Sequence, residues 1–230
     1  MASWCLRRPV AFATRVAPFV ISMPTVEDNA TVRVEAFSDG VFAIAMTLLV
    51  LEIKVPSHEL VAAKGLAQTI LDLWPSYLAF FISFITVLVI WVQHHWVFAL
   101  VNRIDHPFLY WNGLMLLFVT FVPFPTALLS DYLLHPEARV AANLYTGTFF
   151  AISLAFDALW RHATMKLLAD DDTRAKRREA AQVTRQYRYG PPLYFGTFCV
   201  SFVSEAGSVA LCLLLALFFA IRAGQADAAP

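Results

Sequence analysis

Charged residues are scarce in this sequence. Only 15% of its 230 residues are Asp, Glu, Lys or Arg, while 59% are hydrophobic, and the mean hydropathy is +0.63. A typical soluble domain has about a quarter charged residues and roughly half apolar ones. The 17 basic and 17 acidic residues cancel, so no global field favours nucleic acid as a partner. Glycine is also rare between the long apolar runs, with 8 in all, and we therefore predict an all-α, polytopic membrane protein with one membrane domain.

Cysteine and catalytic motifs are also scarce. The three cysteines, Cys5, Cys199 and Cys212, have no metal-type spacing and indicate no disulfide framework. Cys199 and Cys212 lie in apolar runs, where we expect buried, inert thiols. The sequence has no HExxH, no GxSxG, no glycine-rich phosphate loop and no paired carboxylates. We therefore expect no enzymatic activity, no cofactor and no metal.

Apolar segments of spanning length are abundant instead. A helix needs about 20 apolar residues to cross a bilayer. Four segments meet this requirement: Arg33–Lys54, Trp74–Val101, Phe108–Leu129 and Ala141–Ala163. A fifth, Pro191–Ile221, is too long for one simple helix, and Ser204-Glu205-Ala206-Gly207 near its middle predicts a turn between two short helices. The sequence thus predicts six transmembrane helices.

Lysine and arginine are distributed unevenly between the two sides that six helices would define. One side receives the basic N-terminus, Arg33, Arg103, the run from Arg161 to Arg188, and Arg222, and the other receives only Lys54, Lys64 and Arg139. The positive-inside rule then predicts a multi-pass protein of the cell membrane with both termini in the cytoplasm. The charged run "DDDTRAKRREAAQVTRQYRYG" fits a solvated connector, with lipid headgroup contact as the alternative.

These segments suggest three parts of the chain. Residues 1–30 form a basic N-terminal extension that we expect to be mobile. Residues 31–222 form the membrane domain, and residues 223–230 form a C-terminal tail.

The first span begins with an unusual polar segment, Arg33 to Asp39, which we call its polar head. In "RVEAFSDGVFAIAMTLLVLEIKVP", Arg33 to Pro56, only 12 uncharged residues separate Asp39 from Glu52. At about 1.5 Å per residue they cover roughly 18 Å, well short of a hydrocarbon core of about 30 Å. Part of the head must therefore lie at membrane depth, buried in protein or facing water. Alternatively, Arg33 and Glu35 anchor the helix at the headgroups, although that explanation does not account for Asp39.

One face of this span carries a stripe at steps of three and four residues. The stripe mixes bulky aliphatic side chains with one hydroxyl and comprises Arg33, Phe37, Gly40, Ile44, Thr47, Leu48 and Leu51. Such a stripe usually packs against other helices. In a symmetric oligomer it could also line an axis, where the aliphatic side chains would form a constriction.

Polar residues in the later spans could interact with this head. Gln93, His94 and His95 interrupt "ITVLVIWVQHHWVFAL", and Asn112 lies in the next apolar run. A buried Arg–Asp–His–Asn set can satisfy its own hydrogen bonds, with Arg33 and Asp39 compensating each other. The alternative is a metal or catalytic site, but adjacent histidines point to different faces of a helix.

Several motifs together resemble the transmembrane protein 175 family, the potassium channels of lysosomes and their prokaryotic relatives. "RVEAFSD" resembles that family's R-x-x-x-F-S-D signature, and "WVQHHWVF", Asp105 to Asn112, "FVPFPTALL" and "FVSEAGSVALCLLLALFFAI" are similar to its later helices. The resemblance covers about Thr31 to Arg222. One signature copy per chain is typical of the prokaryotic form, whereas the vertebrate form has two. The resemblance implies six helices per subunit and a homotetramer.

The resemblance also implies roles for single residues. The first helix would line a central pore, with its narrowest hydrophobic constriction at Ile44 and the same face continued by Leu48 and Leu51. Thr47 would set cation preference. The remaining motif residues would brace the helix: Arg33, Phe37, Ser38, Asp39, His94 and Asn112. One difference is Glu205, which stands where relatives commonly have proline.

The leading functional interpretation is a tetrameric, potassium-conducting cation channel. The chain has no TVGYG-type filter of backbone carbonyls, so aliphatic rings and a threonine would have to discriminate between ions. Two alternatives remain open. One is a proton-coupled secondary transporter in which Asp39 and His94 relay protons, although the sequence shows no internal symmetry. The other is a membrane scaffold that only oligomerises.

Overall fold

A computed structural model describes residues 26–101, 103–167, 180–181, 184 and 187–226. Most of the predicted N-terminal extension, much of the charged connector and the last residues of the tail lie outside this part of the chain. The described residues form helices and no strands, in agreement with the predicted all-α class. The long helices are α1 (Val26–Leu48), α4 (Trp74–Leu100), α5 (His106–Phe121), α6 (Pro123–Tyr132), α7 (Ala138–His162), α9 (Gly190–Ser201) and α10 (Glu205–Ala226). The shorter ones are η1 (Leu49–Glu52), α2 (His58–Lys64), α3 (Leu66–Asp72) and η2 (Ala163–Leu167).

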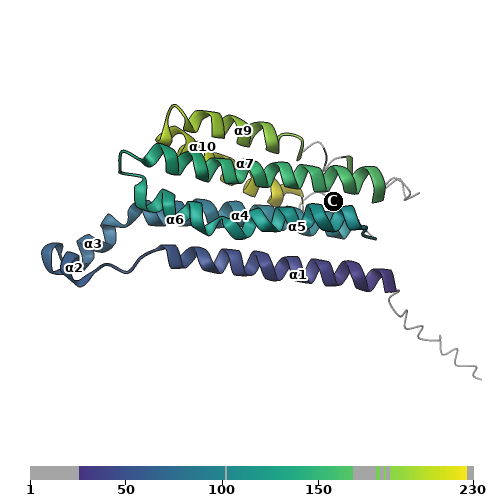
Figure 1. Cartoon of the computed structure of the whole chain (residues 1–230), viewed down its shortest axis with the longest axis horizontal. Coiled ribbons are helices and arrows are strands. Elements are labelled where there is room, and N and C mark those ends of the chain that lie inside the picture. Colours follow the sequence, from purple (N-terminus) through teal and green to yellow (C-terminus); the bar gives the residue numbers. More distant parts are fainter. Residues whose placement is uncertain (1–25, 102, 168–179, 182–183, 185–186, 227–230) are drawn as a thin grey trace, which may run out of the picture.

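The long helices run side by side in one elongated bundle (Figure 1). α1 lies along one side of the bundle, where it packs against α4 and α5. α7, α9 and α10 make up the opposite side, and α4, α5 and α6 lie between. The bundle core is centred on α7, whose Tyr145, Phe149, Ile152 and Trp160 are all at most 2% exposed. α1 is therefore a peripheral helix with only one face in the bundle.

Three helical stretches are long and apolar enough to cross a membrane. They are Ala30–Glu52, Trp74–Leu100 and His106–Tyr132, and Glu205–Ile221 is a shorter apolar helix. The third stretch contains α5 and α6, which meet at Val122, directly before Pro123. Because proline has no N–H, a helix changes its hydrogen bonding there. These helices are those of a membrane protein.

The long last apolar segment divides where the sequence predicted it. α9 ends at Ser201 and α10 begins at Glu205. Ser204 caps the second helix, because its Oγ accepts a hydrogen bond from the Gly207 N–H at 3.0 Å. Glu205 lies in the first turn, where a carboxylate interacts favourably with the helix dipole. The expectation that Cys199 is buried is wrong, because α9 exposes it, whereas Cys212 is buried.

A short helical arm, α2 and α3, connects α1 to α4 beyond one end of the bundle (Figure 1). Gly65 joins the two helices with φ of 82°, a conformation that residues with a Cβ rarely adopt. The Asp72 carboxylate accepts hydrogen bonds from Lys64 at 2.8 Å and from Gln68 at 2.9 Å. These contacts fold the arm back on itself, and they lower the pKa of Asp72.

The candidate pore helix and its polar bracket

α1 and the short helix η1 that continues it have two unlike faces. Ser38, Phe42, Ala45 and Leu49 face the bundle and are at most 1% exposed. The opposite face, which we call the outer face, is formed by the residues of the predicted stripe: Arg33, Phe37, Gly40, Ile44, Thr47, Leu48 and Leu51. Its apolar members are widely exposed, with Phe37 at 66%, Ile44 at 60% and Leu51 at 70%. The stripe is thus the side of the helix that the chain itself leaves uncovered.

A chain of hydrogen bonds fixes the buried face. The Ser38 hydroxyl donates to the carbonyl of Val34 at 2.9 Å, which leaves its oxygen to accept from Asn112 Nδ2 at 3.0 Å. Asn112 Oδ1 is then an acceptor, and it lies 2.8 Å from His94 Nε2. Three helices, α1, α5 and α4, are joined by this relay. The structure therefore brings together Ser38, Asn112 and His94, three of the residues to which the resemblance gave a bracing role.

The same bonds decide the tautomer of His94. Because Asn112 Oδ1 can only accept, His94 Nε2 must carry the proton. His94 is fully buried between the rings of Phe42 and Phe98, with centroid distances of 5.3 and 4.7 Å. Its Nδ1 has no hydrogen-bond partner among the described residues. The side chain thus acts as a neutral donor held in place by packing.

The two carboxylates in the head of α1 find partners on α4. Trp91 Nε1 donates to Asp39 Oδ1 at 2.8 Å, and His95 Nδ1 lies 3.0 Å from Glu35 Oε1. The sequence analysis named His95 among the polar residues that could interact with this head, but it missed Trp91. The signal was available, because Trp91 lies one helical turn before both histidines, three residues from His94 and four from His95.

Arg33 and Phe37 are placed differently from the prediction. The expected compensation of Asp39 by Arg33 does not occur within one chain, because Trp91 holds Asp39 and Arg33 makes no ion pair with the described residues. Arg33 and Phe37 instead line an open groove of about 470 Å³ between α1 and α5. Leu109, Gly113 and Leu116 form its other side. The two residues belong to the outer face, away from His94.

Thr47 presents an oxygen with free lone pairs. Its hydroxyl donates to the carbonyl of Ile44 at 2.9 Å, one turn back in the same helix. The proton is thereby directed at the backbone, and the side chain is exposed. A hydroxyl oxygen in this orientation can act as an acceptor or as a cation ligand.

Charged residues tie both ends of the bundle. Beyond α1, Lys54 forms an ion pair with Asp131 of α6, next to Glu52. At the other end, Asp105 caps α5 by accepting from the Phe108 N–H at 2.9 Å, and its two oxygens lie 2.8 and 2.9 Å from His162 Nε2. Burial raises the pKa of Asp105, but the hydrogen bonds from Phe108 and His162 outweigh it, so the pKa is lowered overall.

In the part of the chain that the structure describes, no group of three His, Cys, Asp or Glu side chains could hold a metal ion. The polar side chains around α1 are hydrogen-bonded to one another and hold a helix in place. What they leave accessible is an aliphatic surface with one hydroxyl.

Comparison with known proteins shows a clear relationship. Residues 33–123 match the family model described as endosomal/lysosomal potassium channel TMEM175. A potassium channel of Chamaesiphon minutus is 58% identical over 198 residues, which cover 85% of this chain and 96% of the relative. A potassium channel of Streptomyces collinus is 43% identical, with 83% and 92% covered. The crystal structure of a lysosomal potassium-selective channel TMEM175 homologue from Chamaesiphon minutus matches with a TM-score of 0.78 and 56% identity, covering 85% of this chain and 98% of that one.

Proposed function

This chain belongs to the TMEM175 family of potassium channels, and from that premise we propose that it forms a tetrameric, potassium-conducting cation channel whose pore is lined by α1. The observation that carries the proposal is the contrast between the two faces of α1. One face is buried and locked by hydrogen bonds to α4 and α5, and the other leaves Ile44, Leu48 and Leu51 uncovered. A helix fixed so firmly on one side presents its outer face in a defined orientation.

Lipid alone is a poor environment for the outer face. Aliphatic side chains are compatible with lipid, but Arg33 lies on the same face, and a charge in the hydrocarbon region is costly. Thr47 also has an oxygen there with unused lone pairs. A pore axis and neighbouring subunits explain both residues, because water and protein can satisfy them. The groove beside Arg33 and Phe37 gives a neighbouring subunit a place to pack.

Four copies of α1 around one axis would place rings of aliphatic side chains in the pore. Ile44, Leu48 and Leu51 are spaced over roughly 10 Å of helix, at about 1.5 Å per residue. A narrow apolar ring offers no oxygen to replace an ion's lost water, and it can dewet and so close the pore. We therefore propose Ile44 as the main constriction, with Leu48 and Leu51 continuing it, and no carbonyl-type filter.

Thr47 is the proposed selectivity element. A ring of four Thr47 oxygens would provide weak ligands to a partly dehydrated cation one turn away from Ile44. Because the hydroxyl protons point at the Ile44 carbonyls, the lone pairs are available to the ion. Such a ring favours an ion that loses water easily, which is potassium rather than sodium.

The hydrogen bonds favour a channel over a proton-coupled transporter. A relay through Asp39 and His94 needs a proton path between them, but Asp39 accepts from Trp91 while His94 donates to Asn112. A second proton on His94 would sit on Nδ1, which faces no acceptor among the described residues. The two residues thus support α1 instead of exchanging protons.

We also propose the topology and the boundaries of the domain. Six helices span the membrane, both termini lie in the cytoplasm, and residues 31–222 form the channel domain. Epitope tags at either end should be accessible only from the cytoplasmic side of intact cells. A tag that is accessible from outside would overturn this orientation.

Flux through proteoliposomes tests the function. Purified protein in potassium-loaded liposomes should show passive flux that follows an imposed voltage. Flux driven by a pH gradient at zero voltage would indicate a transporter, and no flux from an intact tetramer would indicate a scaffold. Cross-linking in the same membranes should give a largest species of four subunits.

A further inference from the structure

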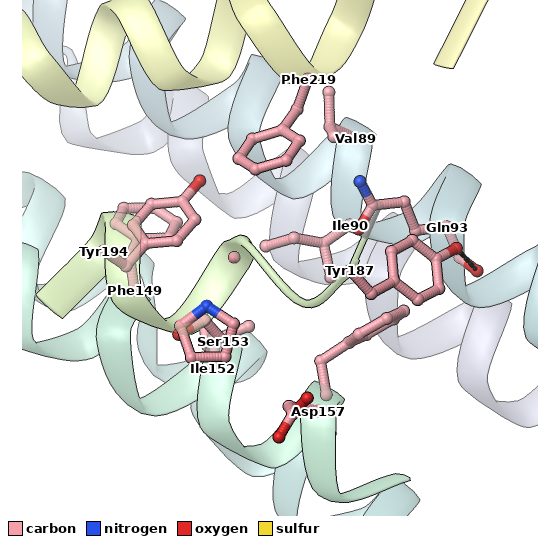
Figure 2. Close-up of a pocket in the computed structure, with 13 residues that line it drawn as sticks. Val89, Ile90, Gln93, Phe149, Ile152, Ser153, Asp157, Tyr187, Tyr194 and Phe219 are labelled. Carbon is pink, nitrogen blue, oxygen red and sulfur yellow. Dashed lines mark hydrogen bonds between the residues drawn. The ribbon is translucent and has the colours of Figure 1, made fainter. Parts of the chain in front are cut away.

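A partly enclosed cavity lies inside each subunit, on the side of the bundle away from α1. It is bordered by α4, α7, α9 and α10, as Figure 2 shows, and its volume is about 50 Å³ for the centres of water-sized spheres. A void of about 10–15 Å³ by this measure holds one water molecule, so this one has room for a ligand of several heavy atoms. None of the proposed pore residues lines it.

Five aromatic side chains line the cavity beside aliphatic and polar ones. Tyr194 stacks between Phe149 and Phe219, with centroid distances of 6.2 and 6.4 Å. Tyr187 meets Phe156 edge-on at 4.9 Å. These five side chains are all at most 9% exposed, so their positions are fixed by packing. Rings fixed in this way around a void offer apolar contact to the alkyl part of a ligand.

The cavity also has polar side chains in its wall, one of them a carboxylate. Asp157 accepts from Arg161 Nε at 2.7 Å through Oδ2 alone, which leaves Oδ1 without a partner among the described residues. The Arg161 side chain is 70% exposed, whereas Asp157 is only 19% exposed. The Tyr194 hydroxyl and the Gln93 amide also line the cavity, and no hydrogen bond within the described part of the chain uses either of them. The site thus combines a carboxylate, two neutral polar groups and an aromatic cage.

The cavity lies next to the segment that holds α1. Val89, Ile90 and Gln93 of α4 face it, as Figure 2 shows. On the same turns, Trp91 and His95 contact Asp39 and Glu35 of α1, and His94 binds Asn112, which in turn holds Ser38. Tyr187 also fixes this segment, because its hydroxyl donates to the Gln93 carbonyl at 3.2 Å. A ligand in the cavity would therefore touch the helix that positions the pore helix.

We propose that this cavity binds a small alkylammonium group and that its occupation alters conduction through α4. The aromatic cage takes the alkyl part, and Asp157 takes the charge. Carboxylates are disfavoured by Asp157, and a neutral alcohol gains only the apolar contact. The effect on conduction rests on the proposed channel function, whereas the binding does not.

Binding can be measured on the full-length protein in phosphatidylcholine nanodiscs. Three probes with the same carbon chain, n-butylammonium, n-butanol and butyrate, are titrated by saturation-transfer NMR. We expect butylammonium to bind about tenfold more tightly than butanol, since one charge-assisted contact contributes about 1.4 kcal/mol. Butyrate should not bind. Equal binding of the amine and the alcohol would overturn the proposal.

Variants locate the site. Asp157→Asn should bring the amine within about twofold of the alcohol. Asp72→Asn, which removes an exposed carboxylate from the distant α2–α3 arm, should leave the preference unchanged. Val89→Phe should fill the cavity and abolish binding of both butylammonium and butanol. If that variant does not fold, Ser153→Leu, at the half-buried edge of the cavity, tests the same expectation. A preference that survives Asp157→Asn would contradict the site.

Two further experiments identify the source of the ammonium ligand and test its effect on conduction. Adding phosphatidylethanolamine to the nanodiscs weakens butylammonium binding if the lipid headgroup occupies the cavity, and leaves it unchanged if the natural ligand is a free amine. In proteoliposomes, butylammonium should change potassium flux in the wild type but not in Asp157→Asn. Binding without any change in wild-type flux would overturn the link to α1. A wild type that binds but conducts nothing would instead contradict the proposed channel function.

Discussion

The indole nitrogen of Trp91 donates a 2.8 Å hydrogen bond to Asp39, and this contact joins the head of the candidate pore helix to α4. Asp39 is half-buried and has no other hydrogen-bond partner among the described residues. Asp39, which the sequence predicted to pair with Arg33, is therefore held by the Trp91 side chain. This arrangement leaves Arg33 on the outer face, available to a neighbouring subunit or to water.

Replacing Trp91 tests this contact directly. Trp91→Phe keeps the ring and removes the donor, so Asp39 loses its partner, at a cost of about 1–3 kcal/mol. We expect a lower unfolding temperature in detergent, followed by circular dichroism. Trp74→Phe is the matched control, because Trp74 lies at the start of α4 and is 49% exposed. Equal effects of the two changes would argue against a stabilising role of the Trp91–Asp39 hydrogen bond.

Thr47→Val should reduce the preference for potassium over sodium while total conduction persists. Valine keeps the shape of threonine and removes the oxygen that could replace part of an ion's water. The measurement is the reversal potential under bi-ionic conditions. Thr120→Val is a close control, since the Thr120 hydroxyl is also exposed and also donates to the carbonyl three residues back, but on α5. An unchanged reversal potential in Thr47→Val would remove Thr47 from selectivity.

Ile44→Asn should raise conductance and weaken discrimination between potassium and sodium. If four Ile44 side chains close the pore, asparagine wets the ring and lowers the barrier to a hydrated ion. The readout is cation flux per unit of purified tetramer. Leu117→Asn places the same polar group at a similarly exposed aliphatic position of α5, with 61% exposure, and should not raise flux. Lower yield of Ile44→Asn with unchanged flux per tetramer would assign Ile44 to packing.

The Asp105 cap should make the stability of the protein depend on pH in the acidic range. Its folded-state pKa is lowered, so its contribution is fully present above the ordinary aspartate pKa of about 3.9 and is lost as pH falls through the folded value. Asp105→Asn keeps a capping side chain and removes the charge. The difference in unfolding temperature between wild type and variant should shrink as the pH falls below about 4. A difference that grows below that pH would contradict the assignment.

Much of this protein could be predicted from local patterns. The apolar runs predicted the helices, and Ser204-Glu205-Ala206-Gly207 predicted the break between α9 and α10, because a glutamate beside a glycine inside an apolar run favours a turn. The three- and four-residue spacing in Arg33 to Leu51 predicted one continuous stripe, and α1 does leave that stripe uncovered. Ser38 was placed with Asn112 and His94 only by the family resemblance, because the polar residues themselves suggested a set of Arg33, Asp39, His94 and Asn112.

The tertiary structure decided what pairs with what. Hydropathy and helical period depend only on neighbours in the sequence, so they determined the class of protein, the helices and the two faces of α1. The partners of Asp39 and Glu35 depend on how α4 is rotated against α1, and no local pattern contains that rotation. Because of the way α1 packs onto α4 and α5, Asp39 accepts a hydrogen bond from Trp91 and Arg33 stays exposed. The sequence alone had predicted that Arg33 and Asp39 compensate each other.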